Sequence, residues 1–165
     1  MMKKLVLFSV LLLSFSFAIM AESVTGDTGG LNSTLLSNLR RFASNTGRNL
    51  NIRSGYRTES QGQSEWDAGL ARGGHISSDH NAAVRNGSDC PYHDLTGGNA
   101  VHAPQRYGSG WMQIARPTLS RHATGDAADV DGITWSDCAE LNRAGLRHTV
   151  RDEPWHVEVG TSCSH

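Results

Sequence analysis

The sequence has one long apolar run and no excess of basic residues. After the run from Leu5 to Ala18, no second apolar span or basic amphipathic segment follows, so nothing predicts a protein that resides in the membrane. The 15 lysines and arginines are balanced by 16 acidic residues, so the basic footprint of nucleic-acid-binding proteins is missing. We therefore expect no nucleic-acid partner, and no membrane span once the N-terminus has been processed.

Cysteine is scarce as well. The chain has three cysteines, Cys90, Cys138 and Cys163, and they form no Cys-x-x-Cys pair, which argues against a cysteine zinc site. An oxidising compartment would allow one disulfide and leave one thiol. The spacing does not tell which two cysteines pair. No internal repeat is present either.

The N-terminus, MMKKLVLFSVLLLSFSFAIMAES, has the features of a secretory signal peptide. Two lysines precede the apolar run and small residues follow it up to Ala21, and the run is too short and wrongly flanked for a membrane anchor. We expect residues 1–21 to be removed on export, which leaves a periplasmic or secreted protein. Loss of Lys3 and Lys4 leaves 13 basic against 16 acidic residues, a net charge near −3.

The mature chain, residues 22–165, has a length of 144 residues (165 minus 21) and is of single-domain size. We expect it to be a monomer. Apolar periodicity predicts a helix over GLNSTLLSNLRRFASNTG, capped at Asn32 or Ser33 and ended by Gly47, and then a strand over NLNIRS. Residues 59–110 are rich in Gly, Ser, Asn and Asp with little periodicity, so we expect irregular chain there.

The C-terminal third again alternates short elements. We expect a strand at 128–130, a short helix over TWSDCAELNRAGL, and two final strands around 146–150 and 156–161. Strands and helices are interleaved without a regular βαβ period. The sequence therefore predicts an α+β fold, a single compact domain with a small, mainly antiparallel sheet flanked by helices.

The stretch DEPWHVEVG places an acid, a proline and a histidine together. Pro154 biases Glu153 away from helical geometry, so Glu153 and His156 cannot form the helical H-E-x-x-H arrangement of zinc peptidases. We expect a turn that enters a strand, in which alternation puts three side chains on the core face: Trp155, Val157 and Val159. His156 then points away from the core, on the same side as Glu158.

A second stretch, SRHATGDAADVDG, supplies partners for His156. His122 and Asp129 are seven residues apart, and Gly125 permits a tight backbone path that can bring their side chains toward one point. Two imidazoles and one carboxylate, with a fourth position for water, form the ligand pattern of a catalytic zinc site. Nitrogen and oxygen ligands beside a carboxylic acid favour zinc over a redox metal. Glu153, three residues before a ligand, would then act as general base.

At these residues the sequence resembles the LAS metallopeptidases, named for lysostaphin-type enzymes, D-Ala-D-Ala carboxypeptidases and the sonic hedgehog signalling domain. The D-alanyl-D-alanine carboxypeptidase branch carries S-x-H-x-x-G-x-A-x-D and a later E-x-W-H, and both motifs are complete here, at residues 120–129 and 153–156. SGYRT at 54–58 resembles the family's S-G-Y-R segment, whose arginine contacts substrate. The resemblance spans roughly 49–160, and residues 59–110 match nothing in it.

The resemblance implies a LAS/hedgehog-like fold with one zinc ion on the sheet, bound by His122, Asp129 and His156. It also implies that Glu153 is the catalytic base and that Arg57 binds the substrate carboxyl or carbonyl oxygen, for which its bidentate fork is suited. Ser120 would form a hydrogen bond with the substrate.

Together these features predict an exported zinc metallopeptidase that acts on peptidoglycan stem peptides, a D,D-carboxypeptidase that releases the terminal D-alanine. The alternative is an endopeptidase of the same fold that cuts within the stem or cross-bridge, in remodelling of the cell's own wall or as an effector against other cells. A rival from another class is a non-catalytic, zinc-stabilised binding module, although a purely structural site has no need of a base such as Glu153. Fold and motif define the reaction more firmly than the bond that is cut.

Structural roles remain as alternatives for single residues. Glu153 could pair with Arg147 or Arg151, Arg57 could form a surface ion pair, and Ser120 could cap a turn. For Trp155 we expect packing in the core.

Four histidines lie in the segment that the resemblance does not cover: His75, His80, His93 and His102. We expect solvated loop histidines, and a second metal site is the alternative.

Overall fold

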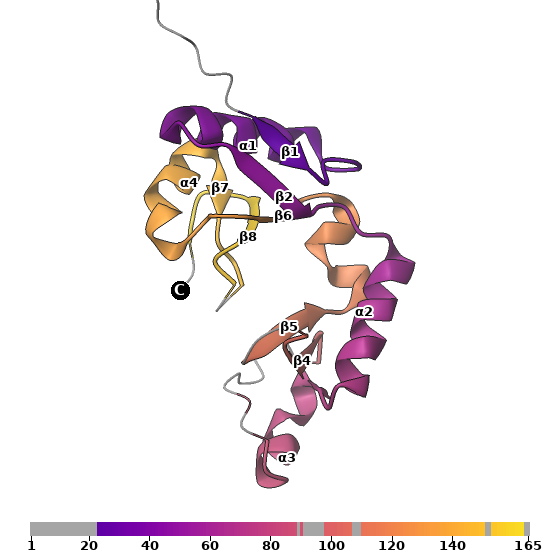
Figure 1. The fold of residues 1–165 in the computed structure, drawn as a ribbon. Helices are drawn as coiled ribbons and strands as arrows, with labels where there is room; N and C mark the ends of the chain where they lie inside the picture. Colours follow the sequence, from indigo (N-terminus) through magenta and orange to yellow (C-terminus); the bar gives the residue numbers. More distant parts are fainter. Residues whose placement is uncertain (1–22, 89, 91–97, 107–109, 151–152, 164–165) are drawn as a thin grey trace, which may run out of the picture.

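The computed structural model describes residues 23–88, 90, 98–106, 110–150 and 153–163. Its elements form two parts, a larger one around a five-stranded sheet and a smaller one around a three-stranded sheet (Figure 1). The expected signal peptide, residues 1–21, lies outside the described residues, so export stays a prediction. Within the described part of the chain, no helix combines the length and apolar character needed to cross a bilayer.

The five-stranded sheet is mainly antiparallel, as predicted. Its strands run in the order β1 (Val24–Gly26), β2 (Leu50–Ser54), β6 (Ala127–Val130), β8 (His156–Val159) and β7 (Leu146–Arg147). Only the outer pair, β1 and β2, is parallel. The two final strands therefore lie where the periodicity placed them, although both are shorter than expected.

Helix α1 (Ser33–Thr46) packs on one face of this sheet (Figure 1). Its N-terminus is capped by Asn32, whose side-chain oxygen accepts a hydrogen bond from the backbone N–H of Thr34 at 2.8 Å, and Gly47 ends it in the left-handed conformation. The apolar side chains at helical spacing, Leu35, Leu39 and Phe42, are fully buried. Both predicted ends of this helix are confirmed.

Helix α4 (Cys138–Ala144) lies beside α1 and follows the 3₁₀ helix η4 (Trp135–Asp137). Thr134 and Asp137 cap this segment reciprocally, with each side chain accepting from the other's backbone N–H. A disulfide between Cys138 and Cys163 ties the helix to the segment that follows β8. Cys90 lies outside this bond, as expected for three cysteines with one bridge.

The two faces of the five-stranded sheet differ in polarity. Ala128 and Val130 of β6 and Val157 of β8 are completely buried in the core against α1 and α4. Because side chains alternate along a strand, Asp129 and His156 project from the opposite face. The candidate site is therefore built on the side of the sheet that the helices leave open.

The expectation of irregular chain over residues 59–110 is wrong. The described residues of this stretch hold α2 (Glu59–Ala71), β3 (His75–Ile76), η1 (Ser77–Asp79), α3 (His80–Arg85) and β4 (Ala100–Pro104). With β5 (Trp111–Ala115), the strands form an antiparallel sheet in the order β3-β4-β5.

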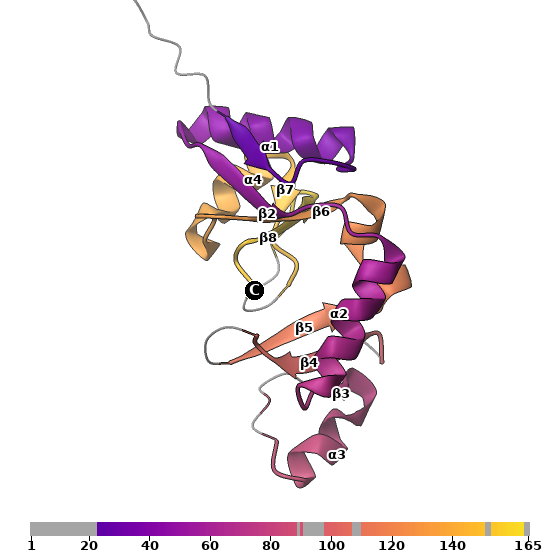
Figure 2. The same ribbon diagram turned by 45° about the vertical axis from the view of Figure 1, so that its right-hand side comes forward.

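Helix α2 shows why periodicity did not reveal this part. Its buried positions are Gly62, Trp66 and Gly69, so two of the three carry no apolar side chain. Gly69 allows the helix to lie directly on the sheet, since a Cβ there would come within 2.6 Å of Cδ1 of Ile114. Figure 2 shows α2 beside β4 and β5, which it contacts. The small apolar core between them contains Trp66, Val101, Ala103 and Ile114.

Two short 3₁₀ helices, η2 (Pro117–Leu119) and η3 (Arg121–Thr124), lead from β5 back to β6. Pro117 packs against α2 at Gly62, where an added Cβ would lie 3.3 Å from the proline Cβ. This returning segment thus carries the first part of the first sequence motif, which continues into β6, and it lies between the two sheets (Figures 1 and 2).

Candidate active site

Three side chains from both sequence motifs meet at the open face of the five-stranded sheet. Asp129 of β6 and His156 of β8 are direct cross-strand partners, and His122 comes from η3. Gly125 ends η3 with φ at 71°, and a Cβ there would lie 2.5 Å from the carbonyl oxygen of Gly30. The tight backbone path predicted for this glycine is therefore present, and it turns the chain from His122 into β6.

The three candidate ligand atoms lie within 4.8 Å of one another. Nε2 of His122 lies 3.3 Å from Nδ1 of His156, which lies 3.2 Å from Oδ1 of Asp129, and the third side of the triangle, from His122 to Asp129, is 3.6 Å. A tetrahedral zinc site with bonds of about 2.0–2.1 Å has ligand atoms separated by about 3.3–3.4 Å. The donor types and their spacing both fit a zinc ion.

The second nitrogen of each imidazole is held by the protein. Nδ1 of His122 donates a hydrogen bond to the carbonyl oxygen of Gly55 at 2.7 Å, so the lone pair of its Nε2 is directed at the cluster. Nε2 of His156 lies 3.4 Å from Oε1 of Glu158, which leaves Nδ1 toward the cluster. Such partners fix the tautomer and ring orientation of metal-binding histidines.

Glu158 was not predicted as a site residue. It is buried, and its carboxylate also lies 3.3 Å from Nη2 of Arg147 and 3.9 Å from Nε of Arg121. The signal that could have found it was the two-residue spacing from His156, which places both side chains on one face of the strand.

The electrostatics of the cluster favour a cation. Burial raises the pKa of Asp129, but hydrogen bonds and charge from the two imidazoles outweigh burial and hold the pKa well below its usual range. Burial lowers the pKa of His156, but hydrogen bonds to Asp129 and Glu158 outweigh it and raise the pKa to about 9. Positive charge is therefore stabilised where the three ligand atoms converge.

Glu153 lies in the turn before β8, with 8% of its surface exposed. Its backbone carbonyl accepts a hydrogen bond from the N–H of His156 at 3.0 Å, which closes the turn that Pro154 predicted. Burial raises the pKa of the Glu153 carboxyl to about 7, while the charges of His156 and Arg57 oppose this rise. Arg147 pairs with Glu158 instead of Glu153, and the other alternative partner, Arg151, lies outside the described residues.

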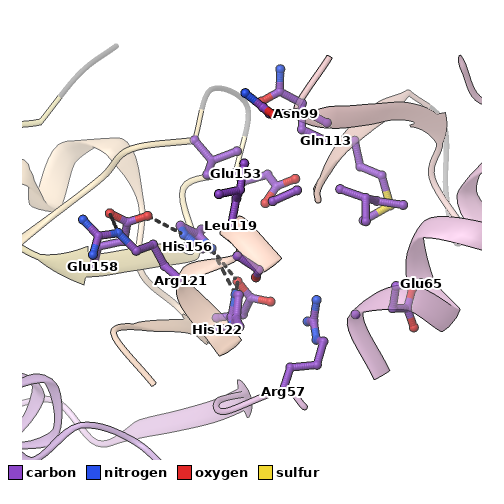
Figure 3. Close-up of a pocket in the computed structure, with 18 of the residues that line it drawn as sticks. Arg57, Glu65, Asn99, Gln113, Leu119, Arg121, His122, Glu153, His156 and Glu158 are labelled. Carbon is purple, nitrogen blue, oxygen red and sulfur yellow. Dashed lines mark hydrogen bonds and ion pairs between the residues drawn. The ribbon is translucent and has the colours of Figure 1, made fainter. Parts of the chain in front are cut away.

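A cavity of about 430 Å³ lies between the two parts of the molecule, with the cluster in its wall. Arg57 and Ser120 both line it, and Figure 3 shows the Arg57 side chain pointing into it. Nη2 of Arg57 donates to Oγ of Ser54 at 2.8 Å, and no acidic side chain of the described residues lies within ion-pair distance of it. Ser120 precedes η3, but its hydroxyl does not cap that helix.

The position of Trp155 differs from the prediction. The residue is partly exposed, lines the cavity, and has the guanidinium of Arg53 5.3 Å from its ring centroid. The alternation that we extended to Trp155 applies only within β8, which begins at His156. Trp155 belongs to the preceding turn and therefore does not enter the core.

Two of the four histidines from the unmatched segment also depart from expectation. His102 is completely buried in β4 and His75 is partly buried in β3, so neither is a solvated loop residue. The side chain of His80 and the whole of His93 lie outside the described residues.

Comparison with known proteins gives a distant structural likeness. No protein-family model and no curated protein matches the chain. Among solved structures, it is similar to a mutant of the vancomycin resistance D,D-pentapeptidase VanY from a VanB-type resistance cassette in complex with Zn(II), at 19% identity and a TM-score of 0.44 over 78% of this chain and 72% of that one. It is also similar to VanYB in complex with D-alanine-D-alanine, at 20% identity and a TM-score of 0.43 over 78% and 71% of the two chains.

Proposed function

We propose that this protein is an exported zinc-dependent peptidase that acts on peptidoglycan stem peptides as a D,D-carboxypeptidase. The observation that carries the proposal is the meeting of His122, Asp129 and His156 at zinc-ligand spacing in the wall of a cavity that also contains the buried carboxyl of Glu153. The complete S-x-H-x-x-G-x-A-x-D and E-x-W-H motifs of the LAS resemblance agree with this geometry.

The cluster would hold one zinc ion through Nε2 of His122, a carboxylate oxygen of Asp129 and Nδ1 of His156. When bound, zinc would supply a Lewis acid that polarises the scissile carbonyl and makes a water more acidic. Gly55 and Glu158 keep the imidazoles oriented for this role.

Glu153 provides the proton transfer. A carboxyl whose pKa lies about 7 can take a proton from the attacking water and pass it to the leaving amine near neutral pH. Burial of Glu153 supplies this tuning, because removal from water disfavours the charged carboxylate.

Arg57 supplies recognition of the terminal carboxylate. The other arginine in the cavity wall, Arg121, lies near Asp126 and Glu158, whereas Arg57 donates to a neutral hydroxyl and keeps N–H groups for a substrate. A guanidinium binds a carboxylate in bidentate fashion. A carboxypeptidase requires such a contact beside the scissile bond, and Ser120 would add a hydrogen bond from the same wall.

The proposal is tested with zinc-loaded protein and purified muropeptides, with products identified by mass spectrometry. Pentapeptide stems should lose one alanine while cross-linked dimers stay intact. Arg57→Ala should lower kcat/KM roughly 10- to 100-fold, as for loss of a charged hydrogen bond of about 1.5–3 kcal/mol. Arg53→Ala, which removes the cation over the Trp155 ring, serves as the matched control.

Two other outcomes of this experiment would contradict the carboxypeptidase proposal and indicate a different function. Cleavage of cross-links would indicate the endopeptidase, in which Arg57 acts on the carbonyl oxygen. No product from any muropeptide, with zinc bound, would indicate the binding module.

A further inference from the structure

A second cluster of metal-binding side chains lies in the smaller part of the molecule. His75 of β3 and His102 of β4 are direct cross-strand partners, and Cys90 follows α3 in the chain. One nitrogen of each imidazole and the sulfur of Cys90 all lie within 4.8 Å of one another. Three segments that are separate in the sequence thus bring N, N and S donors to one point.

This cluster is on the face of the three-stranded sheet that α2 does not cover. Val101 and Ala103 pack in the apolar core beneath α2, so the intervening His102 projects from the opposite face. His102 is 0% exposed there and Cys90 is 7% exposed. The ring of His75 stands edge-on to that of His102, with centroids 5.4 Å apart. Two imidazoles and a thiol therefore lie together on this face, two of them buried and His75 partly buried.

Metal binding would account for this arrangement. Burial of polar groups costs free energy that ligation offsets. The apolar core of this part of the molecule is small, with four buried members among the described residues, Trp66, Val101, Ala103 and Ile114, and small cores are often stabilised by a structural metal. A metal here would join β3, β4 and the segment after α3.

The ligand set favours zinc. Imidazole and thiolate are the donors of structural zinc sites. The same pair of imidazoles with one thiolate also occurs in blue-copper sites, which add a distant methionine sulfur. Met112 of the neighbouring strand pairs with Ala103, on the face of the sheet toward α2. Its sulfur lies 3.9 Å from Nη2 of Arg72, away from the cluster.

The cluster is connected to the cavity through β5. Nε2 of His102 lies 3.3 Å from the side-chain nitrogen of Gln113, its cross-strand partner. Gln113 lines the cavity, and its backbone N–H stabilises the charged form of Glu153. A metal that fixes His102 would therefore also hold in place the wall that faces the first site.

We propose that His75, Cys90 and His102 bind a second, structural zinc ion, which stabilises the β3-β4-β5 sheet and the cavity wall that it forms. This proposal does not depend on peptidase activity. The same chain would then bind two zinc ions through different donors, with oxygen and nitrogen at the first site and sulfur and nitrogen at the second.

The difference in donors gives the test. Metal-free full-length protein, kept under non-reducing conditions, is titrated with Co²⁺ and followed in the near ultraviolet, where only a thiolate ligand gives a sulfur-to-cobalt charge-transfer band. Cys138 and Cys163 are joined in a disulfide, so such a band reports on Cys90. In parallel, zinc-loaded protein is analysed for metal content.

Reciprocal variants separate the two sites. Wild type should bind two metal ions per chain and show the band. His156→Ala should bind one and keep the band, whereas Cys90→Ser should bind one and lose it. One metal ion in wild type, absence of the band in wild type, or its persistence in Cys90→Ser would overturn the proposal.

A measurement on unmodified protein remains decisive if Cys90→Ser does not fold. X-ray absorption at the zinc edge of wild type should show a sulfur neighbour at about 2.3 Å beside nitrogen and oxygen at about 2.0–2.2 Å. A spectrum with only nitrogen and oxygen neighbours would refute the second site. Copper in place of zinc in freshly purified protein would refute the zinc assignment.

Discussion

Glu153 and His156 belong to one four-residue motif but face different chemical environments. His156 lies between the carboxylates of Asp129 and Glu158, which stabilise positive charge at its imidazole. Glu153 is buried in the turn, and its pKa rises to about 7. The backbone turn at Pro154 produces this difference, because it directs the His156 side chain into the cluster and leaves the Glu153 side chain beside it.

Variants of Glu153 and His156 should distinguish the proposed general base from a proposed metal ligand. Glu153→Gln should keep the zinc stoichiometry of wild type and lower kcat by about 10²–10⁴-fold, because only proton transfer is removed. His156→Ala should lose the metal of the first site and, with it, stability. Metal content, thermal unfolding and turnover on pentapeptide stems measure these effects. The control is Glu140→Gln on the partly exposed surface of α4, which should change none of the three. A Glu153→Gln protein without first-site metal would show that Glu153 is a ligand.

A second prediction concerns the partner of His156. Glu158→Gln should weaken zinc binding at the first site about 10- to 100-fold, since loss of the carboxylate that orients a ligand imidazole has effects of this size. Glu158 also pairs with Arg147, so Arg147→Gln is the matched control that removes the ion pair and keeps the imidazole contact. Competition with a chromogenic chelator measures the affinity. Equal losses in both variants would assign Glu158 a structural role only.

At the scale of elements, the turn from η3 into β6 determines whether the ligands meet. Gly125 has positive φ and no room for a side chain, because the backbone of Gly30 lies against it. The adjacent carbonyl of His122 accepts the N–H of Arg57 at 3.1 Å, so the same turn also positions the SGYRT segment. One glycine therefore links the three candidate metal ligands to Arg57, the proposed substrate-binding residue.

Gly125→Ala should lower the free energy of unfolding by more than Gly47→Ala. Both glycines have φ near 65–70°, where a side chain costs about 1–2 kcal/mol. A Cβ at Gly47 meets nothing within 4 Å, whereas one at Gly125 meets backbone at 2.5 Å. Urea denaturation of the two variants measures the difference, and zinc affinity should fall only for Gly125→Ala. Equal destabilisation would mean that the turn can shift to make room.

At the scale of the whole molecule, the cavity is a product of two sheets. The five-stranded sheet and η3 carry the cluster of His122, Asp129 and His156, and the β3-β4-β5 sheet with α2 supplies the facing wall. Residues of this wall, including Glu65 of α2 and Gln113 of β5, lie outside both sequence motifs. In the proposed peptidase, substrate choice should therefore depend on residues of the smaller part of the molecule, and the reaction on residues of the larger part.

The last prediction concerns the compartment in which the protein works. The lysine-led apolar run predicts export, and the Cys138–Cys163 disulfide agrees with an oxidising destination. Intact-mass analysis of protein recovered from the periplasm or medium should place the mature N-terminus near Glu22. Thiol counting under denaturing, non-reducing conditions should give one thiol. A species that retains Met1, or a monomer with no thiol, would contradict these expectations.

Local sequence patterns predicted the ends of α1 and four of the five strands of the larger sheet, all except β1. They also predicted the residues of the first site, whose roles stay a prediction. These features depend on interactions between residues that are close in the sequence. Examples are the cap at Asn32, the left-handed glycine at Gly47 and the alternation of side chains in β8. Two short motifs with fixed spacing also predict that His122, Asp129 and His156 belong to one site.

The smaller part of the molecule could not be predicted from local sequence patterns. Helix α2 buries glycines where an apolar stripe would be expected, because its close approach to β4 and β5 replaces side-chain packing; the local signal that remained, a capping box between Thr58 and Gln61, was short. The clustering of Cys90 with His75 and His102, whose candidate ligand atoms lie within 4.8 Å of one another, and the burial of Glu153 both depend on contacts between segments far apart in the chain. Such contacts leave no periodic trace in a sequence, since loop closure and packing, rather than neighbouring residues, bring the groups together.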